Sequence, residues 1–439
     1  MELELATDDT EVDCHCVASY PPFSVWSAAH VPAALHALAA PSDDGTDGPL
    51  GLYLHIPFCR KRCKFCYFRV YTDKNSSDIE TYLDALVQEV SLYARSPRVA
   101  GRSLEFVYFG GGTPSYLSSD QLRRLMDRIG DQWPRTTDCE GTFECEPGTL
   151  NKAKLEAIKE IGTTRLSIGV EHFDDEVLDA NGRPHKSAEI HRSYEWAQEV
   201  GFDQINLDLI VGMVGDTEGK WKETVAQTLA MDADSVTIYQ MELPYNSTFA
   251  REAKASGESV VAAGLATKRA WLAYAFGEFE SAGYVVVSAY TVVKPSGNNR
   301  FVYRDSVWRG RDMIGTGVAS FSYLGGVHFQ NFDKWDAYIE PLGRKTLPLA
   351  RAYVMSDRDR LIREFALQLK LGRVDVAAFR DKFGVDIGQE FAKALSVLSG
   401  EGMLDLDGDA ITLTRAGLLR ADAIITRFFD PQFRDIRYS

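Results

Sequence analysis

The sequence predicts an α/β fold, a partial (β/α)6 barrel of the TIM type followed by a C-terminal helical, winged-helix-like domain. Two observations lead to this prediction. Between residues 50 and 240, six short apolar runs alternate with helical stretches, which favours parallel strands joined by right-handed crossovers. Near the C-terminus three helical stretches are instead followed by a hairpin signal. The 439 residues suffice for two domains, because single cores stop growing at roughly 250 to 300 residues.

The expected strands are short apolar runs, and the stretches between them carry apolar residues at a spacing near 3.6. Two helices have capping-box starts, Ser77 with Glu80 and Ser118 with Gln121. In such barrels the chemistry lies at the C-terminal ends of the strands. The predicted strands are 52–56, 104–109, 142–145, 165–170, 205–211 and 235–239, and the helices between them are 79–94, 122–129, 155–161, 188–200 and 221–229.

The chain divides into four predicted segments. They are a leader over 1–48, the barrel over 49–290, a connecting region over 291–355 and the C-terminal domain over 356–439. The leader ends in a polar, turn-rich stretch typical of a linker. Its residues 20–26 are too apolar for a solvated tail, so we expect them to pack on the body, with a place over the active site as one option.

Charge and hydropathy exclude several classes of partner. The net charge of −15 disfavours a broad surface for nucleic acid or for an anionic membrane. No apolar run approaches the roughly 20 residues that span a bilayer, and the acidic N-terminus lacks the basic start of a signal peptide. We therefore expect a cytoplasmic protein with neither a nucleic-acid nor a membrane partner.

Three of the seven cysteines form a C-x3-C-x2-C motif directly after the first predicted strand: Cys59, Cys63 and Cys66. Thiolates bind soft metals, and three of them can hold three irons of a cubane while the fourth iron stays open. The alternative is a zinc site, which normally needs four protein ligands. The remaining cysteines offer no obvious closing pair in the same loop, although the segment 14–16, Cys-His-Cys, keeps this alternative open. We interpret the motif as an iron-sulfur site.

The motif resembles that of the radical S-adenosylmethionine (SAM) superfamily. More narrowly, Tyr53-x-His55-Ile-Pro-Phe-Cys59 together with the segment 110–114, Gly-Gly-Gly-Thr-Pro, is similar to the oxygen-independent coproporphyrinogen III oxidase family, over about residues 50 to 425. That family also includes haem chaperones, anaerobic haem-degrading enzymes and class C methyltransferases and cyclopropanases. The resemblance implies a 4Fe-4S cluster on the three cysteines and one or two molecules of SAM.

The resemblance also implies which residues bind the cofactor. Glycines let the backbone approach the methionine end, and strand-end carboxylates accept hydrogen bonds from ribose hydroxyls. The cofactor-binding residues implied are Tyr53, Phe65, Gly111, Gly112, Thr113, Glu144, Glu171, Arg183 and Asp208.

The sequence departs from the family pattern at three places. Glu171 stands where the family usually has glutamine, which removes two donors and can add a negative charge. His172 beside it is either a proton shuttle or a packed histidine, and we predict catalytic roles for Glu171, His172 and Tyr53. Phe68 replaces a fourth cysteine of the oxidases, and the aromatic-glutamine pair expected around 299–303 is not found.

Phe68, Glu171 and the apolar segment 20–26 of the leader, which a minimal chaperone would not need, favour the class C branch as the specific function. The enzyme would transfer a SAM-derived carbon, by methylation or cyclopropanation, to an unsaturated carbon of a small-molecule or natural-product substrate. One alternative is coproporphyrinogen oxidation or haem breakdown, with Arg62, Arg69 and Arg300 holding propionates. Another is a non-enzymatic haem chaperone. An electron donor such as flavodoxin or ferredoxin is the expected protein partner, and the basic loop 60–62 is a candidate contact for it.

Overall fold

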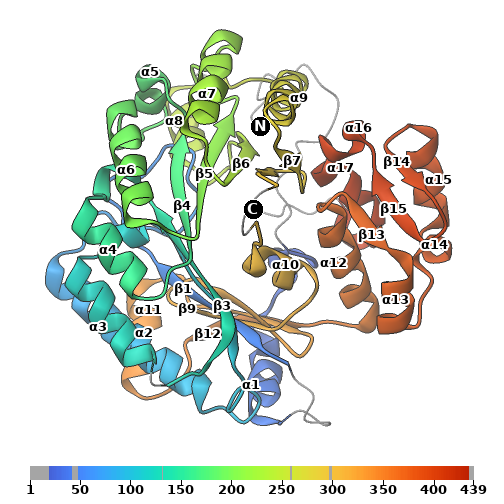
Figure 1. Cartoon of the computed structure of the whole chain (residues 1–439). Helices are drawn as coiled ribbons and strands as arrows, with labels where there is room; N and C mark the ends of the chain where they lie inside the picture. Colours follow the sequence, from blue (N-terminus) through green and yellow to red (C-terminus); the bar gives the residue numbers. More distant parts are fainter. Residues whose placement is uncertain (1–18, 42–47, 131, 258–259, 296–298, 435–439) are drawn as a thin grey trace.

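The computed structural model describes residues 19–41, 48–130, 132–257, 260–295 and 299–434. A barrel-like body carries a smaller C-terminal domain at its side (Figure 1). Within these ranges no helix combines the length and the apolar character needed to cross a membrane. The segment 14–16, named above for zinc, lies outside the described residues.

Six parallel strands in sequence order form the centre of a twelve-stranded sheet, which confirms the predicted fold class. Each predicted strand is present, and the largest difference is the third strand, which begins earlier than its apolar run. The strands are β1 (Leu50–Ile56), β2 (Leu104–Gly111), β3 (Arg135–Cys145), β4 (Arg165–Glu171), β5 (Gln204–Val211) and β6 (Ser235–Gln240).

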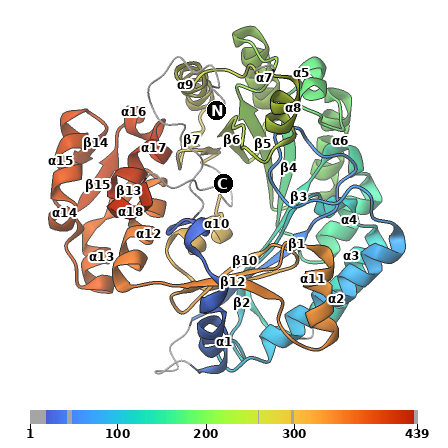
Figure 2. The ribbon, with the colours of Figure 1, turned by 180° about the vertical axis from the view of Figure 1, so that it is seen from behind.

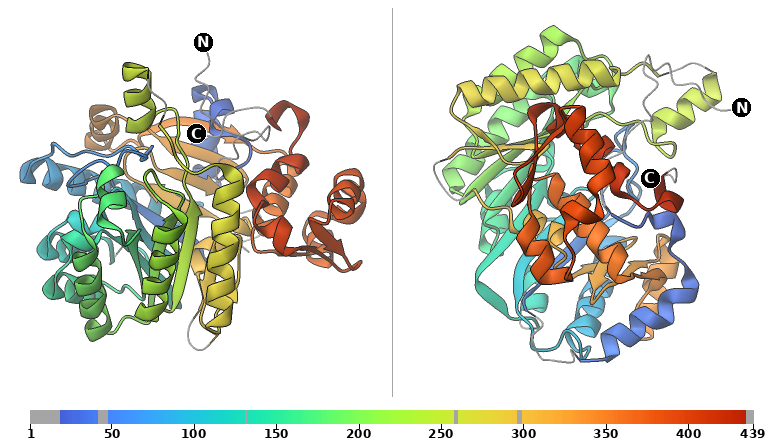
Figure 3. Two further views of the ribbon diagram at one scale, coloured as in Figure 1. Left: turned by 90° about the horizontal axis from the view of Figure 1, so that it is seen from above. Right: turned by 90° about the vertical axis from the view of Figure 1, so that its right-hand side faces the viewer.

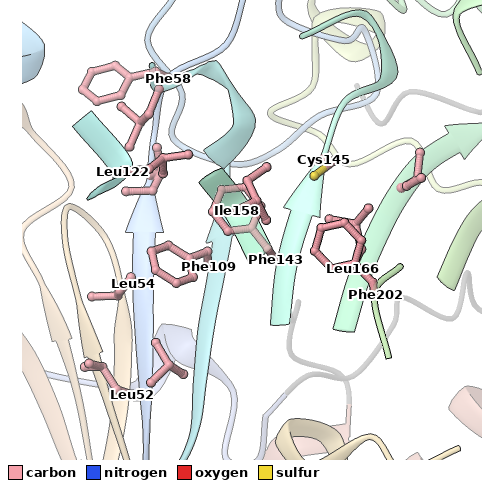
Figure 4. Close-up of a cluster of buried hydrophobic side chains, with 14 of the residues drawn as sticks. Leu52, Leu54, Phe58, Phe109, Leu122, Phe143, Cys145, Ile158, Leu166 and Phe202 are labelled. Atoms are coloured by element: carbon pink, nitrogen blue, oxygen red, sulfur yellow. The ribbon is translucent and has the colours of Figure 1, made fainter. Parts of the chain in front are cut away.

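Helices cover the outer face of these strands, as Figures 1 and 2 show. Because successive side chains of a strand point to opposite faces, one set of alternate residues packs under the helices. Figure 4 shows part of this core, with Leu54, Phe109, Phe143 and Leu166 side by side. The other set faces the barrel interior and carries the polar groups. The outer helices are α2 (Ser76–Ala94), α3 (Ser119–Gly130), α4 (Lys152–Glu160), α6 (Ser187–Val200) and α7 (Glu218–Met231).

The region predicted as a connection, 291–355, adds strands to both ends of the parallel sheet. β9 (Met313–Thr316) pairs in parallel with β1, and three antiparallel strands continue the sheet beyond it. At the other end, β8 (Thr291–Val293) pairs antiparallel with β6 and with the short β7 (Val285–Val286). The strands beyond β9 are β10 (Phe321–Leu324), β11 (Val327–Asn331) and β12 (Leu349–Val354).

The apolar part of the leader packs on the body, as expected. Phe23 stacks on Phe321 with ring centroids 4.2 Å apart, and Trp26 stacks on His328 at 4.8 Å. Ser27 then forms a β-bridge with Ala352 of β12, and α1 (Val31–Ala39) follows. The packing partners found for this segment lie on β10–β12 and in the C-terminal domain, at the side of the barrel and not over the cysteine loop.

The C-terminal domain is helical with a small antiparallel sheet, and it stands beside the barrel (Figure 3). The hairpin of β14 (Leu404–Leu406) and β15 (Ala410–Leu413) lies at the predicted turn, and β13 (Arg373–Asp375) adds a third strand. The domain has its own buried core, which includes Phe365 and Phe391. Its main helices are α12 (Asp357–Leu369), α13 (Val376–Phe383) and α15 (Ala392–Gly400).

Candidate active site

The three cysteines lie in the loop that follows β1. Hydrogen bonds fix this loop to other segments: Cys59 N donates to Tyr71 O and Lys64 N to Asn181 O, both at 3.0 Å. Phe65 anchors it by packing into an apolar cluster formed by the ends of β5 and β6 and the helix that follows. The loop is therefore held from several sides, and its three half-buried thiols keep a fixed arrangement.

Burial makes the thiolate form costly at two of these cysteines. It raises the pKa of Cys59 to about 12 and that of Cys66 to about 11. Thr113 Oγ1, 3.3 Å from Cys59 Sγ, offsets part of this cost at Cys59, and the charge of Arg183 offsets part of it at both thiols. Arg183 Nη1 itself lies 3.3 Å from Cys63 Sγ. Among the described residues no three His, Cys, Asp or Glu side chains surround a point where one ion would sit. A cubane needs one thiol on each of three irons, whereas a zinc ion normally needs four protein ligands, so the three thiols of this loop fit a cluster better than zinc.

The glycine triplet brings the end of β2 close to the cysteine loop. Gly112 N donates to Ile56 O at 2.8 Å, and a Cβ at Gly112 would lie 2.8 Å from that same carbonyl oxygen. Gly111 has a φ of +109°, and its Cβ would lie 2.5 Å from the ring of His55. Both positions therefore require glycine, since a side chain would push the two segments apart.

Glu144 lies beside the triplet on the interior face. It accepts hydrogen bonds from Tyr108 Oη at 2.6 Å and from Gly111 N at 3.2 Å, and Tyr53 stacks on Tyr108 at 5.7 Å. Burial raises the pKa of Glu144 to about 7, and Asp208 adds to the effect. The structure thus brings together Tyr53, Glu144 and Gly111, as the sequence predicted.

The other two predicted acids complete an acidic interior surface. Asp208 accepts a hydrogen bond from Ser167 Oγ at 2.7 Å. Glu171 Oε1 lies 3.4 Å from Arg183 Nη2, and burial raises the pKa of Glu171 to about 7. Glu171 has a φ of +63°, a left-handed conformation that few residues other than glycine adopt. Arg183 connects this surface to the cysteine loop, because it contacts both Glu171 and Cys63.

These features fit the cofactors that the resemblance implies. SAM carries a positive sulfonium, and carboxylates favour a nearby positive charge. The ribose hydroxyls of the same cofactor can donate hydrogen bonds to Asp208. The glycine backbone leaves room for its methionine end. Three thiols, an acidic surface and a glycine edge thus converge at the C-terminal ends of β1 to β5.

His172 does not join this group. Its fully buried ring accepts a hydrogen bond from Asp174 N at 2.9 Å and lies 3.2 Å from Asp216 and from Thr224. The ring packs near Trp221 of the outer core, on the helix side of the sheet. This placement gives no support to a proton shuttle, and it fits the packed-histidine interpretation.

Sequence reasoning missed several interior residues. Tyr108 lies two residues before Gly110 in β2, so both point to the same face of the sheet. This alternation could have predicted that Tyr108 faces the barrel interior. Arg165 opens an apolar strand with a charge, which was a second signal. Of the arginines named for propionates, Arg69 instead pairs with Asp333 at 2.6 Å, and Arg62 donates to the carbonyl of Cys66 at 2.9 Å.

Comparisons with known proteins agree with this geometry. The sequence family described as the radical SAM superfamily matches residues 53–227, and the family described as the HemN C-terminal domain matches residues 355–420. The heme chaperone HemW of Bacillus subtilis is 28% identical, over 86% of this chain and 98% of its own. The oxygen-independent coproporphyrinogen III oxidase of Synechocystis is 27% identical, over 84% and 82%. The solved structure of coproporphyrinogen III oxidase (HemN) from Escherichia coli has a TM-score of 0.81 and 26% identity, covering 93% of this chain and 96% of that one.

The chain therefore belongs to the radical SAM superfamily, whose members use a 4Fe-4S cluster and SAM. Cys59, Cys63 and Cys66, free thiols in the loop after β1, would hold that cluster. Within the superfamily the chain belongs to the HemN-like family, because both its barrel and its C-terminal domain match that family.

Proposed function

We propose that this radical SAM enzyme abstracts hydrogen from a carboxylate-bearing tetrapyrrole, as an enzyme of the coproporphyrinogen oxidase type. The observation that carries the proposal is the extent of the likeness: the barrel, the added strands and the C-terminal domain all follow the Escherichia coli oxidase at a TM-score of 0.81. A shared superfamily barrel alone would not extend to the C-terminal third of the chain.

The chain's own residues supply binding, orientation and exclusion of water. When bound, the cluster and SAM supply an electron and a 5'-deoxyadenosyl radical that abstracts hydrogen. Glu144 and Asp208 would hold the cofactor on the interior face, and the glycine edge would leave room for its approach to the thiols. The aromatic rings of Tyr53, Tyr108 and Tyr303 form a wall on this face: Tyr53 stacks on Tyr108, and the tilted ring of Tyr303 has its centroid 4.2 Å from that of Tyr108. This wall positions a target and keeps water away from a reactive carbon.

A reductant is required for this chemistry, and we propose an acidic electron carrier of the flavodoxin or ferredoxin kind. The cysteine loop carries the exposed cations Arg60 and Lys61. Arg60 pairs with Glu146 at 3.0 Å, which leaves Lys61 as the more available contact in this loop.

The test is turnover by anaerobically reconstituted protein. We expect 5'-deoxyadenosine in the presence of a reductant, and we expect its yield to rise when coproporphyrinogen III is added, together with an oxidised tetrapyrrole detected by mass spectrometry. Formation of 5'-deoxyadenosine without any change in the added tetrapyrrole would contradict the proposal.

A haem chaperone is the second candidate, and Phe68 favours it. This residue, 44% exposed, stands where the oxidases have a fourth cysteine, and the match spans 98% of the Bacillus subtilis chaperone. Titration with haem, with and without SAM, separates the two candidates. Tight haem binding without tetrapyrrole oxidation would support the chaperone.

Carbon transfer from SAM, the reaction favoured by the sequence, gains no support from these relatives, and the oxidase alternative fits them better. It stays a prediction. Label from the SAM methyl group in an unsaturated acceptor would support carbon transfer, whereas label found only in methionine would contradict it.

A further inference from the structure

Arg165 is a buried cation on the interior face, at the start of β4. Its exposed fraction is 2%. Its Nε is fully covered and makes no hydrogen bond, and no ion pair of this guanidinium occurs within the described residues. Ser167 and Gly169, the next residues of the same parity, line the acidic surface described above. Arg165 therefore lies on the same face of β4 as these residues, but nearer the N-terminal end of the strand and further from the cysteine loop.

An aromatic ring fixes the guanidinium in place. The ring centroid of Phe301 lies 3.9 Å from Arg165 Cζ. Phe301 itself is held by its neighbours, because the backbone N–H groups of Val302 and Tyr303 donate to Glu140 at 2.8 and 3.2 Å. The ring orients the planar fork of the arginine, and it supplies no full negative charge.

The charged groups around Arg165 are engaged elsewhere. Arg304, a second cation over the Phe301 ring at 5.6 Å, pairs with Asp305 at 2.8 Å. Asp208 on the adjacent strand lies close enough to Arg165 for this cation to oppose the rise in its pKa, but its oxygens accept hydrogen bonds from Ser167 and Asn206. The buried guanidinium therefore has a carboxylate in its neighbourhood but no hydrogen-bonded anionic partner, and an anionic group that reaches it would be stabilised.

We propose that Arg165, stacked on Phe301, is the anchoring site for a carboxylate that enters the barrel interior. This inference rests on the proposed function and deepens it, since it names the substrate group that is recognised. An oriented guanidinium binds a carboxylate through two parallel hydrogen bonds. Two sources of the carboxylate share this chemistry: a side chain of the tetrapyrrole substrate, and the methionyl end of a second SAM molecule.

The first experiment compares binding of coproporphyrin III with binding of its tetramethyl ester, using cluster-loaded protein with SAM under anaerobic conditions. We expect the wild type to bind the free acid about tenfold or more tightly than the ester, and Arg165→Met to lose most of that preference. Arg165→Lys keeps the charge without the fork and should fall between the two. The matched control is Arg128→Met, which removes a surface cation paired with Asp84 on the outer helices and should bind as the wild type does.

The second experiment measures SAM stoichiometry by equilibrium dialysis with labelled cofactor. If Arg165→Met binds one SAM molecule fewer than the wild type, the carboxylate belongs to a second SAM. If it binds as many SAM molecules but no longer prefers the free acid of the porphyrin, the carboxylate belongs to the tetrapyrrole. If the wild type binds neither porphyrin, the proposed function is contradicted. The number of SAM molecules bound then tests the role of Arg165 by itself. If Arg165→Met, folded by circular dichroism, keeps both the acid preference and the stoichiometry, the inference is overturned. Should that variant not fold, the same two readouts on Arg165→Lys decide.

Discussion

The carboxyl group of Glu144 should make the affinity for SAM depend on pH. Burial and the nearby carboxylates raise the pKa of Glu144 to about 7, whereas a cationic cofactor favours its ionised form. Affinity for SAM should therefore be high above pH 7 and should fall as the pH drops through 7. With a pKa of about 7 the ionised fraction is about ten-elevenths at pH 8 and about one-eleventh at pH 6, so this group alone lowers the affinity about tenfold.

The assay is equilibrium dialysis of SAM against cluster-loaded protein at pH 6, 7 and 8 and constant ionic strength. The amino group of the cofactor also titrates in this range, at about 7.7 to 8.0, so the wild type is compared with Glu144→Gln. The variant should bind SAM more weakly at pH 8 and should lose about tenfold less affinity than the wild type between pH 8 and 6. Glu171, with a pKa of about 7, leaves a remaining slope in both proteins. Equal slopes in the two proteins would refute this account of Glu144.

Three further changes test other parts of the structure. Gly112→Ala places a Cβ 2.8 Å from the carbonyl oxygen of Ile56, so iron and sulfide content after reconstitution should fall by about half or more; Gly130→Ala, which meets nothing within 4 Å, is the control. Trp26→Ala should lower the free energy of unfolding by about 3 to 5 kcal/mol, and a shift in melting temperature within error would contradict the packing of the leader. Arg183→Met leaves the buried carboxylate of Glu171 without its partner, at a cost of about 3 to 5 kcal/mol in folding free energy. The yield of 5'-deoxyadenosine should therefore collapse. Partial recovery of the yield in Arg183→Lys would separate the effect of the charge from that of the guanidinium geometry.

The sequence was sufficient for the parallel strands and the cysteine loop, because their signals are local. An apolar run followed by a helical period predicts each strand where it forms, and C-x3-C-x2-C places three thiols in one loop regardless of distant contacts. The edge strands were not predictable in this way. β9 is four residues long, and its pairing with β1 depends on contacts more than 250 residues apart along the chain, for which no local pattern exists.

The site itself was predicted in part. Glu144 and Glu171 lie together at the ends of β3 and β4, as expected from the fold class, and Asp208 lies within β5 beside them. Arg183 follows α5 (Asp175–Ala180) and was implied only by the family resemblance. His172 was misplaced by assuming that the residue after Glu171 shares its surroundings. Alternation along the strand puts His172 on the helix side, with Ile168 and Val170 of the outer core, because Glu171 faces the interior. Arg165 and Phe301 meet only through tertiary packing between β4 and the segment before α10 (Val302–Trp308), so no spacing rule links them.

The pairing of β1 with β9 has a consequence for biosynthesis. The strand that leads into the cysteine loop has β2 on one side and a strand from the last third of the protein on the other. While the ribosome is still making residues before 313, that flank of β1 is an unsatisfied edge. We therefore expect cluster loading to follow synthesis of this late strand, because in a shortened product the strand that leads into the cysteine loop would form an open, aggregation-prone edge of the sheet.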